Sequence, residues 1–239
     1  MDWRLRLLAR EEIAEQTTAF YLEKPPNLRY APGQFVDLGL VDLPEWDEEG
    51  KSRSLTIASA PCEGRLLFAM RMRNTPYKRR LGALPLGSEL IIDEPEGAFT
   101  LQNDARRPAV FLAGGIGVTP FRSMIRQSVH ERLQRRLFLF YSNRRPEDAA
   151  FLEELRALAR EHEWFRFIPT MTQPWQSRRG WTEETEYIGP ELIGRHVGAL
   201  AEPVYYLAGP PAMIQSVNQA LVEAGVNRSD INADPFDGY

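Results

Sequence analysis

The sequence holds few of the residues that several classes of protein require. Of its 239 residues, one is a cysteine, Cys62, and three are histidines. A single thiol excludes an intrachain disulfide and an iron–sulfur cluster held only by cysteines of this chain. The three histidines are scattered, and their neighbours lack the spacing of metal ligands, so no metal site is expected. A Gly-x-Ser-x-Gly motif for a serine nucleophile is also missing.

Long apolar runs are absent as well. No segment is long enough to cross a membrane, and charged residues interrupt the N-terminal stretch MDWRLRLLAREE, which lacks the apolar core of a signal peptide. The formal net charge of −4 argues against general binding of nucleic acid. The expected location is therefore the cytoplasm, and no feature of the sequence indicates an oligomeric state.

The chain has two parts that differ in pattern near residue 105. In the first part, short apolar stretches alternate with glycine and proline, which is typical of an antiparallel β-barrel. A helix is predicted at Pro76–Ala83, and the acidic stretch Asp42–Glu49 is predicted to be a loop. The predicted strands are Trp3–Leu8, Thr18–Glu23, Gln34–Leu40, Ser54–Ala58, Arg65–Arg71 and Glu89–Asp93. A barrel domain is thus predicted over residues 1–104.

After a polar linker, Gln102–Pro108, apolar strands alternate with amphipathic helices. The predicted strands are Ala109–Ala113, Leu137–Ser142, Phe165–Pro169 and Val204–Ala208. The predicted helices are Pro120–Gln127, Glu147–His162, Pro190–Val197 and Pro211–Ala224. This alternation predicts an α/β domain with a parallel sheet over residues 105–239.

A glycine-rich loop joins the first strand of the α/β part to its first helix. The segment Leu112–Phe121 reads LAGGIGVTPF. Glycines let a backbone approach a pyrophosphate, and a helix N-terminus offers free N–H groups and partial positive charge. The spacing matches neither the Rossmann fingerprint nor a Walker loop. Taken alone, the loop fits a phosphate site and a plain strand–helix turn equally well.

Other segments of the sequence favour the phosphate site over the plain turn. Tyr206–Met213 (YLAGPPAM) ends a later strand and is expected beside the glycine loop, at the sheet edge where α/β domains bind ligands. In the barrel part, Pro32–Val36 (PGQFV), Arg53–Thr56 (RSLT) and Glu96–Phe99 (EGAF) follow in order. This ordered set, which spans nearly the whole chain, resembles the ferredoxin–NADP reductase family of flavoproteins.

For the barrel, the resemblance implies a flavin site. Arg53 takes the position of an arginine that pairs with a flavin phosphate, and Thr56 that of the catalytic hydroxyl residue near flavin N5. Leu55 stands where the family usually has an aromatic residue that stacks on the flavin. The alternatives are an ordinary surface ion pair for Arg53 and an ordinary strand residue for Thr56. The expected flavin contacts are Arg53, Ser54, Leu55, Thr56, Arg71, Lys78 and Phe99.

For the α/β part, the resemblance implies a nicotinamide-nucleotide site. Ala208 replaces a cysteine that lies near the hydride-transfer centre in relatives. A plain helix start is the alternative for Gly209–Pro211, because proline suits a first turn. The expected contacts are Gly114, Gly115, Gly117, Thr119, Pro120, Ser142, Thr172, Gly209, Pro210 and Pro211. Phe236 or Tyr239 would cover the flavin face, unless the tail is frayed.

These assignments predict a flavin-dependent oxidoreductase. It would transfer a hydride from NAD(P)H to FAD and pass electrons to a carrier such as ferredoxin or flavodoxin. One alternative is an NAD(P)H-dependent flavin or ferric reductase. A second is a non-catalytic nucleotide- or partner-binding module, which Leu55 and Ala208 favour and Arg53, Thr56 and the intact glycine loop oppose. Three roles are open for the basic stretch Met70–Leu81. Its cations would bind the flavin pyrophosphate, dock an acidic carrier or form a solvated helix face.

NADH is the expected donor, with NADPH possible. Thr172 and Gln173 stand where NADPH-using relatives place a Ser-Arg pair, and they bring no charge to the 2′-phosphate. Glu183, Glu184 and Glu186 would repel that phosphate if they faced it. The arginines that favour NADPH instead are Arg144, Arg178 and Arg179.

Overall fold

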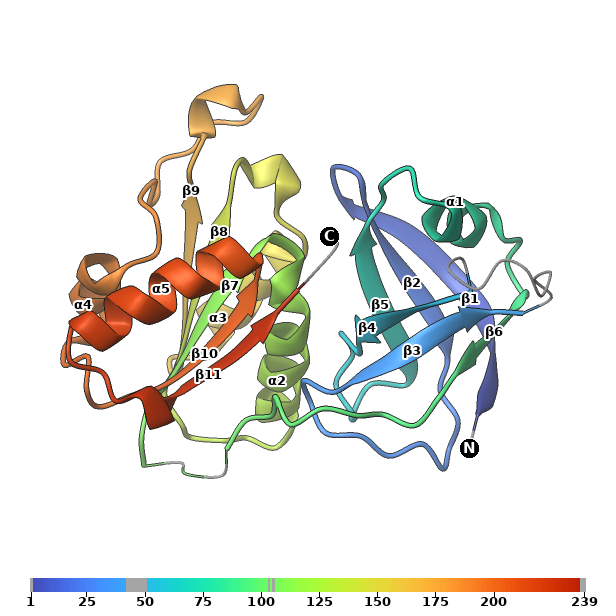
Figure 1. Ribbon diagram of the computed structural model, residues 1–239, viewed down its shortest axis with the longest axis horizontal. Helices are drawn as coiled ribbons and strands as arrows, with labels where there is room; N and C mark the ends of the chain where they lie inside the picture. Colours follow the sequence, from blue (N-terminus) through green and yellow to red (C-terminus); the bar gives the residue numbers. More distant parts are fainter. Residues whose placement is uncertain (1, 42–50, 103, 105, 237–239) are drawn as a thin grey trace.

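The computed structural model describes residues 2–41, 51–102, 104 and 106–236, and consists of two β-sheet domains side by side (Figure 1). One sheet has six antiparallel strands and the other has five parallel strands. The predicted fold class is therefore confirmed. The predicted loop Asp42–Glu49 lies outside the described residues. Within the described part of the chain, no helix is long and apolar enough to span a membrane.

The N-terminal sheet has the strand order β4-β3-β6-β1-β2-β5. Its strands are β1 (Trp3–Ala14), β2 (Thr17–Glu23), β3 (Phe35–Leu40), β4 (Ser52–Thr56), β5 (Arg65–Arg71) and β6 (Glu89–Ile92). Alternating residues such as Leu7, Phe20, Leu38 and Phe68 are fully buried and form the barrel core. Helix α1 (Pro76–Ala83) packs onto this core through Tyr77, whose hydroxyl donates a hydrogen bond to the carbonyl of Leu38 at 2.8 Å.

The C-terminal sheet has the order β11-β10-β7-β8-β9. Its strands are β7 (Ala109–Gly114), β8 (Leu137–Asn143), β9 (Phe165–Met171), β10 (Val204–Gly209) and β11 (Ile231–Pro235). Its helices are α2 (Thr119–His130), α3 (Leu152–Glu161), α4 (Pro190–Val197) and α5 (Pro211–Glu223). Apolar residues of α2 and α3 cover one face and those of α4 and α5 cover the other. Both faces are buried, as a parallel sheet requires.

Several elements differ from the prediction in their bounds, and β1 runs to Ala14 rather than ending at Leu8. No strand was predicted after the last helix, but Ile231–Pro235 forms strand β11, which pairs in parallel with β10. The helix predicted from Glu147 begins at Leu152 instead, after a 3₁₀ turn at Pro146–Asp148. The backbone before the helix is left-handed at Phe151, with φ of 59°, so the helix cannot continue through this residue.

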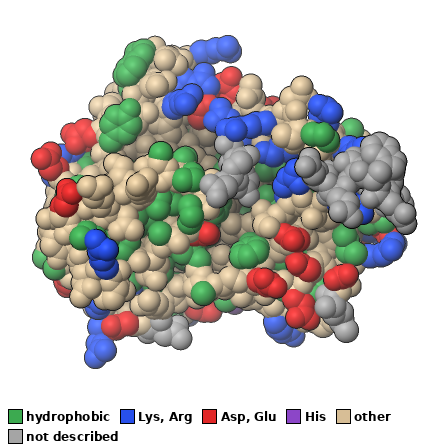
Figure 2. All heavy atoms as spheres, in the orientation of Figure 1, with side chains coloured by type: hydrophobic (Ala, Val, Ile, Leu, Met, Phe, Trp, Pro, Cys, Tyr) green, Lys and Arg blue, Asp and Glu red, His purple; other side chains and the backbone are tan. Residues whose placement is uncertain are grey.

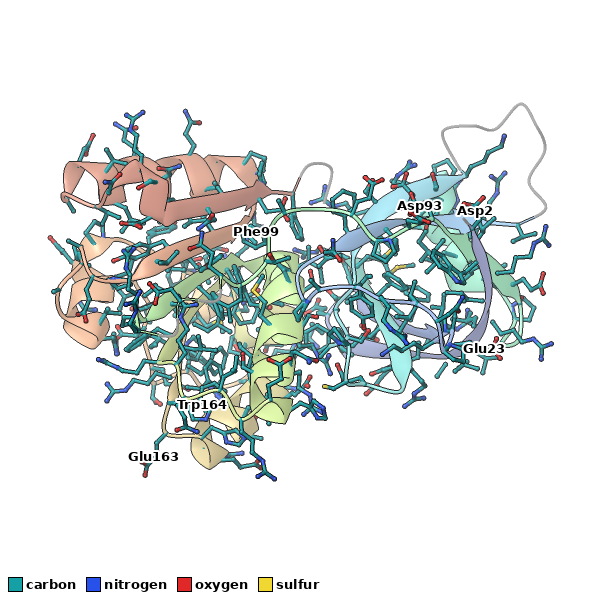
Figure 3. All side chains as sticks on the ribbon, turned by 90° about the horizontal axis from the view of Figure 1, so that it is seen from below. Asp2, Glu23, Asp93, Phe99, Glu163 and Trp164 are labelled. Atoms are coloured by element: carbon teal, nitrogen blue, oxygen red, sulfur yellow. The ribbon has the colours of Figure 1, made fainter. Side chains whose placement is uncertain are left out.

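The connecting segment between the sheets packs against the second domain. Phe99 lies where the two domains meet (Figure 3), with its ring centroid 5.8 Å from that of Phe121 and 5.9 Å from that of Tyr206. Gly33 of the barrel has φ of +100°, and a Cβ there would lie 2.1 Å from the Phe99 carbonyl oxygen. Glycine at position 33 therefore permits this close approach.

Candidate functional site

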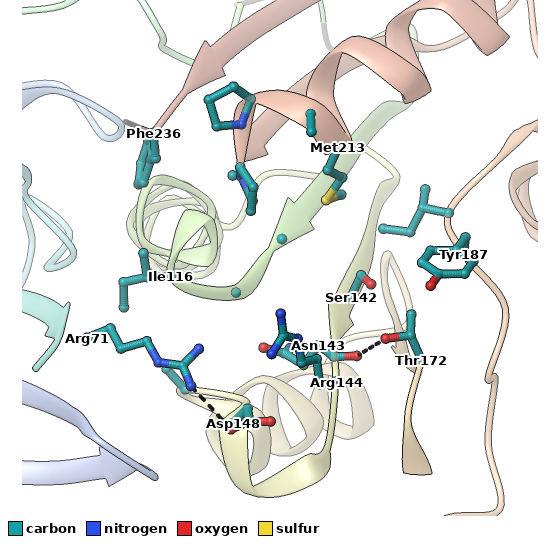
Figure 4. A pocket seen from close by; sticks show the side chains of 18 of the residues that line it. Arg71, Ile116, Ser142, Asn143, Arg144, Asp148, Thr172, Tyr187, Met213 and Phe236 are labelled. Atoms are coloured by element: carbon teal, nitrogen blue, oxygen red, sulfur yellow. Dashed lines mark hydrogen bonds and ion pairs between the residues drawn. The ribbon is translucent and has the colours of Figure 1, made fainter. Parts of the chain in front are cut away.

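A cavity of about 740 Å³ lies where the carboxyl ends of the parallel strands face the barrel (Figure 4). This volume lies within the range of cofactor sites, and the position is where open α/β sheets bind ligands. Of the predicted site residues, the cavity wall includes Arg71, Gly114, Gly115, Ser142, Thr172, Gly209, Pro210, Pro211 and Phe236.

The glycine loop and the Gly-Pro-Pro segment form one side of the cavity. Strands β7 and β10 pair directly, with Ala113 opposite Ala208. A Cβ on Gly209 would lie 2.9 Å from the backbone nitrogen of Gly114, and one on Gly114 would lie 2.5 Å from the sulfur of Met213. The two segments are in contact, as predicted, and neither position has room for a side chain.

The later part of the loop has a different role from its beginning. Gly115 has φ of +54° and open space around its Cα, so the backbone stays accessible from the cavity. A Cβ on Gly117, by contrast, would lie 2.3 Å from the carbonyl oxygen of Ala208. Thr119 is 2% exposed and donates its hydroxyl hydrogen bond to the carbonyl of Ile116 at 3.0 Å. Gly117, Thr119 and the buried Pro120 thus lie behind the cavity wall and hold the loop on the sheet.

The barrel contributes two arginines to this cavity, of which Arg71 was an expected flavin contact. Arg73 lines the wall together with Arg71, and Arg71 forms an ion pair with Asp148 at 3.8 Å. Asp148 also binds Arg145 at 2.8 Å. Sequence reasoning missed Asp148 and included Arg73 only within the basic stretch Met70–Leu81. The other wall residues it missed include Thr17, Ile116, Asn143, Tyr187 and Met213.

Three cations cluster beside the cavity on the barrel side. The Lys78 side chain is buried, at 5% exposure, and its Nζ donates a hydrogen bond to the carbonyl of Arg71 at 2.8 Å. Burial, together with the positive charges of Arg73 and Arg53, lowers the pKa of the Lys78 ammonium to about 8. Guanidinium and ammonium groups suit the phosphate groups of an anion.

The residues of the predicted motif on β4, Arg53–Thr56, lie in two different environments. Arg53 belongs to the cation cluster, and Leu55 belongs to the barrel core. The Arg53 guanidinium is exposed and lies over the Tyr77 ring, 5.4 Å from its centroid. The Ser54 hydroxyl donates to the Asp37 carboxylate. Leu55 is 4% exposed and belongs to the barrel core, whereas Thr56 is half-buried and pairs with Phe35.

The predicted flavin contacts that lie outside the cavity wall stay predictions. They are Arg53, Ser54, Leu55, Thr56, Lys78 and Phe99. Packing already accounts for the position of Leu55 in the barrel and of Phe99 between the domains. Phe236 lines the cavity, and its backbone N–H donates to the carbonyl of Gly209 at 2.9 Å. Tyr239 lies outside the described residues. No cluster of His, Cys, Asp and Glu suited to a metal occurs in the part of the chain that the structure covers.

Comparison with known proteins places the chain in a family. Residues 111–219 match the model described as the oxidoreductase NAD-binding domain. The chain is 31% identical to ferredoxin–NADP reductase B of Sorangium cellulosum over 87% of its own length and 86% of that protein. It is 27% identical to the reductase component of propane 2-monooxygenase of Mycolicibacterium smegmatis, over 98% of this chain and 68% of that protein.

Solved structures show the same fold. The ferredoxin reductase of carbazole 1,9a-dioxygenase aligns with a TM-score of 0.83 at 22% identity, over 99% of this chain and 69% of that chain. A ferredoxin–NADP⁺ reductase from Neisseria gonorrhoeae with bound FAD and NADP aligns with a TM-score of 0.80 at 21% identity, over 98% of both chains.

The chain therefore belongs to the ferredoxin–NADP reductase family of oxidoreductases. It is an enzyme of the flavoprotein class that uses FAD and NAD(P)H. The residues present fit both cofactors. The cationic cluster of Arg53, Arg73 and Lys78 suits a pyrophosphate, and the cavity at the carboxyl edge suits a nucleotide.

Proposed function

We propose that this chain takes a hydride from NADH and delivers the electrons, through FAD, to a separate acidic carrier such as ferredoxin or flavodoxin. When bound, the flavin supplies an acceptor for the hydride at N5. The observation that carries the proposal is the cluster of Arg53, Arg73 and Lys78 beside a large cavity at the carboxyl edge of the parallel sheet. A cation cluster on one domain and a nucleotide-sized cavity against the other are what two adjacent dinucleotides require.

The residues of the chain divide the work in this proposal. Arg53 and Lys78 bind the flavin pyrophosphate, since a guanidinium and an ammonium both suit phosphate. The Thr56 hydroxyl, which can donate or accept, serves flavin N5. Gly114, Gly115 and Gly209 give the nicotinamide nucleotide access to backbone N–H groups, and Phe236 covers the flavin face. The protein's contribution is position and electrostatics, because hydride transfer between the cofactors needs no protein nucleophile.

Two further assignments belong to the proposal. The domain boundary falls at residue 104, so residues 1–104 form the flavin domain and residues 105–239 the nicotinamide domain. The protein works in the cytoplasm, where the reduced nicotinamide pool resides.

Replacing Arg53 with alanine tests the flavin assignment. The variant removes one charge-assisted partner of the phosphate, and we expect FAD affinity to fall by about tenfold to a hundredfold. The measurement is the FAD content of purified protein, followed by titration of the apoprotein with FAD. Equal FAD content and affinity in Arg53→Ala and wild type would remove Arg53 from the site.

The carrier assignment rests on the basic side chains of α1. In Figure 2, Lys and Arg side chains gather at the top of the face, mostly over the nucleotide-binding domain and the boundary between the domains, whereas Asp and Glu side chains gather low on the barrel. Arg79 is exposed on α1, and Arg80 follows it. In a chain with a net charge of −4, two neighbouring arginines on α1 favour the docking of an acidic partner at this helix.

Reversing both charges, Arg79→Glu with Arg80→Glu, should slow electron transfer to an acidic ferredoxin by about tenfold at low salt, and less at high salt. Reduction of the bound FAD by NADH should not change. The matched control is Arg160→Glu with Arg166→Glu, which alters the net charge equally on α3 and β9. If the control slows carrier reduction as much as the α1 variant, net charge rather than docking explains the effect.

The choice between NADH and NADPH depends on the charges near the 2′-phosphate. The structure alters one reason for expecting NADH: Glu183 is ion-paired with Arg156, and Glu184 and Glu186 are ion-paired with Arg195. Two arginines therefore offset part of the charge of these three carboxylates. Thr172 lines the cavity without charge, and the exposed Arg144 lines it close by.

NADH remains the proposed donor, and Arg144 sets how well NADPH competes. Arg144→Gln should lower kcat/KM for NADPH by about tenfold, because it removes the cation that faces the 2′-phosphate. The value for NADH should stay within about twofold, since NADH carries no phosphate there. Steady-state kinetics with both donors measures the change. An equal loss with both donors would place Arg144 at a part of the nucleotide that NADH and NADPH share.

A further inference from the structure

Helix α2 begins directly after the glycine loop and lies on the side of the parallel sheet that faces the barrel (Figure 1). Its first turns carry Arg122, which is 6% exposed. A buried arginine needs compensation for every charge and hydrogen bond that it takes out of water. The contacts that provide this compensation come from both domains.

On the barrel side, Arg122 binds the turn that follows β4. Its Nη1 donates to the carbonyl of Ala58 at 2.8 Å and to Glu63 Oε2 at 2.9 Å, and its Nη2 donates to Glu63 Oε1 at 3.1 Å. Glu63 also accepts a hydrogen bond from the backbone N–H of Ala60 at 2.6 Å. The guanidinium therefore holds both ends of one short turn, and Thr56 lies two residues before that turn.

On the nucleotide-domain side, Arg122 binds helix α3. Its Nε donates to Glu154 Oε2 at 2.9 Å, and its Nη2 lies 2.8 Å from Glu154 Oε1. The guanidinium also lies 5.1 Å from the ring centroid of Phe151, the left-handed residue that starts this helix. The two carboxylates raise the pKa of Arg122 against the effect of burial, so the group stays charged.

Ser123 makes a second link of the same kind. Its hydroxyl donates to the carbonyl of Ser59 at 2.7 Å, next to the carbonyl that Arg122 binds. Behind the glycine loop, Gly117 is pressed against the backbone of Ala208. The loop, the start of α2 and the turn after β4 thus form one continuous set of short contacts.

We propose that Arg122 is a positioning residue for hydride transfer. By fixing α2 to the Ala58–Glu63 turn, it sets the distance between the nicotinamide held by the glycine loop and the flavin atom served by Thr56. This inference rests on the proposed function, because it takes the loop and Thr56 to hold the two reacting cofactors. A misplacement of about 1 Å costs on the order of a hundredfold in rate when reacting atoms are held in place.

Two variants test the proposal. Arg122→Lys keeps the charge and loses the fork that reaches Ala58, Glu63 and Glu154 together. Ser123→Ala removes only the hydroxyl link. We expect anaerobic reduction of bound FAD by NADH to slow by about tenfold or more in Arg122→Lys, with the Kd for NADH within about twofold of wild type. The reduction rate of Ser123→Ala should lie between those of wild type and Arg122→Lys. If Arg122→Lys fails to fold, Ser123→Ala alone tests the proposal.

A second readout does not depend on turnover. Hydrogen exchange of the backbone amides of residues 57–63 and of α2 should accelerate in both variants, because the link between the domains is weaker. The matched control is Arg107→Gln, which removes an arginine bound to Asp230 at 2.7 Å and to the carbonyls of Glu202 and Pro203, all within one domain. It should lower stability and leave both the reduction rate and this exchange pattern unchanged.

The outcomes distinguish a failure of the Arg122 proposal from a failure of the proposed function. If Arg122→Lys and Ser123→Ala bind FAD and reduce it at the wild-type rate, Arg122 does not position the reaction. If Arg107→Gln slows reduction as much, loss of stability explains the effect and the proposal is overturned. If the wild-type protein itself is not reduced by NADH or NADPH, the proposed function fails instead.

Discussion

Gly117→Ala is expected to lower the melting temperature by about 10 °C, which corresponds to roughly 3 kcal/mol for a chain of this size. A Cβ at this position would lie 2.3 Å from the carbonyl oxygen of Ala208, 2.5 Å from its carbonyl carbon and 2.6 Å from the nitrogen of Gly209. All three are backbone atoms of β10 or its end, so no side chain can move aside. Strand β10 must shift away from the loop, and the cavity wall shifts with it.

The matched control is Gly115→Ala in the same loop. Nothing lies within 4 Å of a Cβ there, and the cost is the left-handed backbone, with φ of +54°, worth about 1 kcal/mol. Thermal unfolding should therefore change little. Because Gly115 lines the cavity, the added methyl should instead weaken NADH binding. Equal melting temperatures for Gly117→Ala and wild type would show that the loop and β10 do not approach as closely as described.

Lys78→Met is expected to have opposite effects on the apoprotein and on FAD binding. In the apoprotein, burial lowers the pKa of Lys78 from 10.5 to about 8, so its charged form opposes folding at neutral pH. The variant loses the hydrogen bond to the Arg71 carbonyl, worth about 1 kcal/mol. The apo variant should thus unfold at the same or a higher temperature than wild type. Its affinity for FAD should fall by about tenfold or more, because the pyrophosphate loses a buried cation.

The pH dependence gives a second check on Lys78. Between pH 8 and 10.5 the unfolded chain binds the Lys78 proton and the folded apoprotein does not, so apoprotein stability should rise with pH across this window. Lys78→Met should lose this rise. Wild-type FAD affinity should decline above pH 8, as the lysine of the apoprotein deprotonates. Denaturant titrations and FAD titrations at several pH values measure both effects.

Lys24→Met provides the matched control for this experiment. Lys24 is also a partly buried lysine of the barrel, whose Nζ donates to the carbonyls of Pro61 and Glu63, and burial lowers its pKa. We expect this variant to leave FAD affinity unchanged. If Lys78→Met binds FAD as tightly as wild type while Lys24→Met does not, the anion site has been assigned to the wrong lysine.

Much of the fold was predictable because it depends on local pattern. Strand β5 and helices α1 and α4 have the predicted bounds, because β5 is a continuous apolar run between two arginines and a proline starts each helix. Strand β11 was missed because INADP is half polar and only partly buried. It becomes a strand because it pairs with the edge of β10. The residues near position 231 do not by themselves indicate this tertiary pairing.

The site was predictable in part for the same reason. Gly114, Gly115 and Gly209 reach the cavity because their motif fixes the local backbone. The role of Gly117 depends on Ala208, a residue distant in sequence that packs against it. Likewise, the contact of Arg122 with the barrel turn and the ion pairs of the carboxylates after β9 depend on tertiary neighbours, and no motif signals them.

The central claim is that FAD bound to the barrel receives a hydride from a nicotinamide nucleotide bound in the cavity of the second domain. Anaerobic titration of the purified, FAD-loaded protein with NADH tests it most directly. The flavin absorbance should bleach in proportion to added NADH, with one equivalent reducing one bound FAD. A protein that holds FAD and is bleached by dithionite, yet is bleached by neither NADH nor NADPH, would contradict the account.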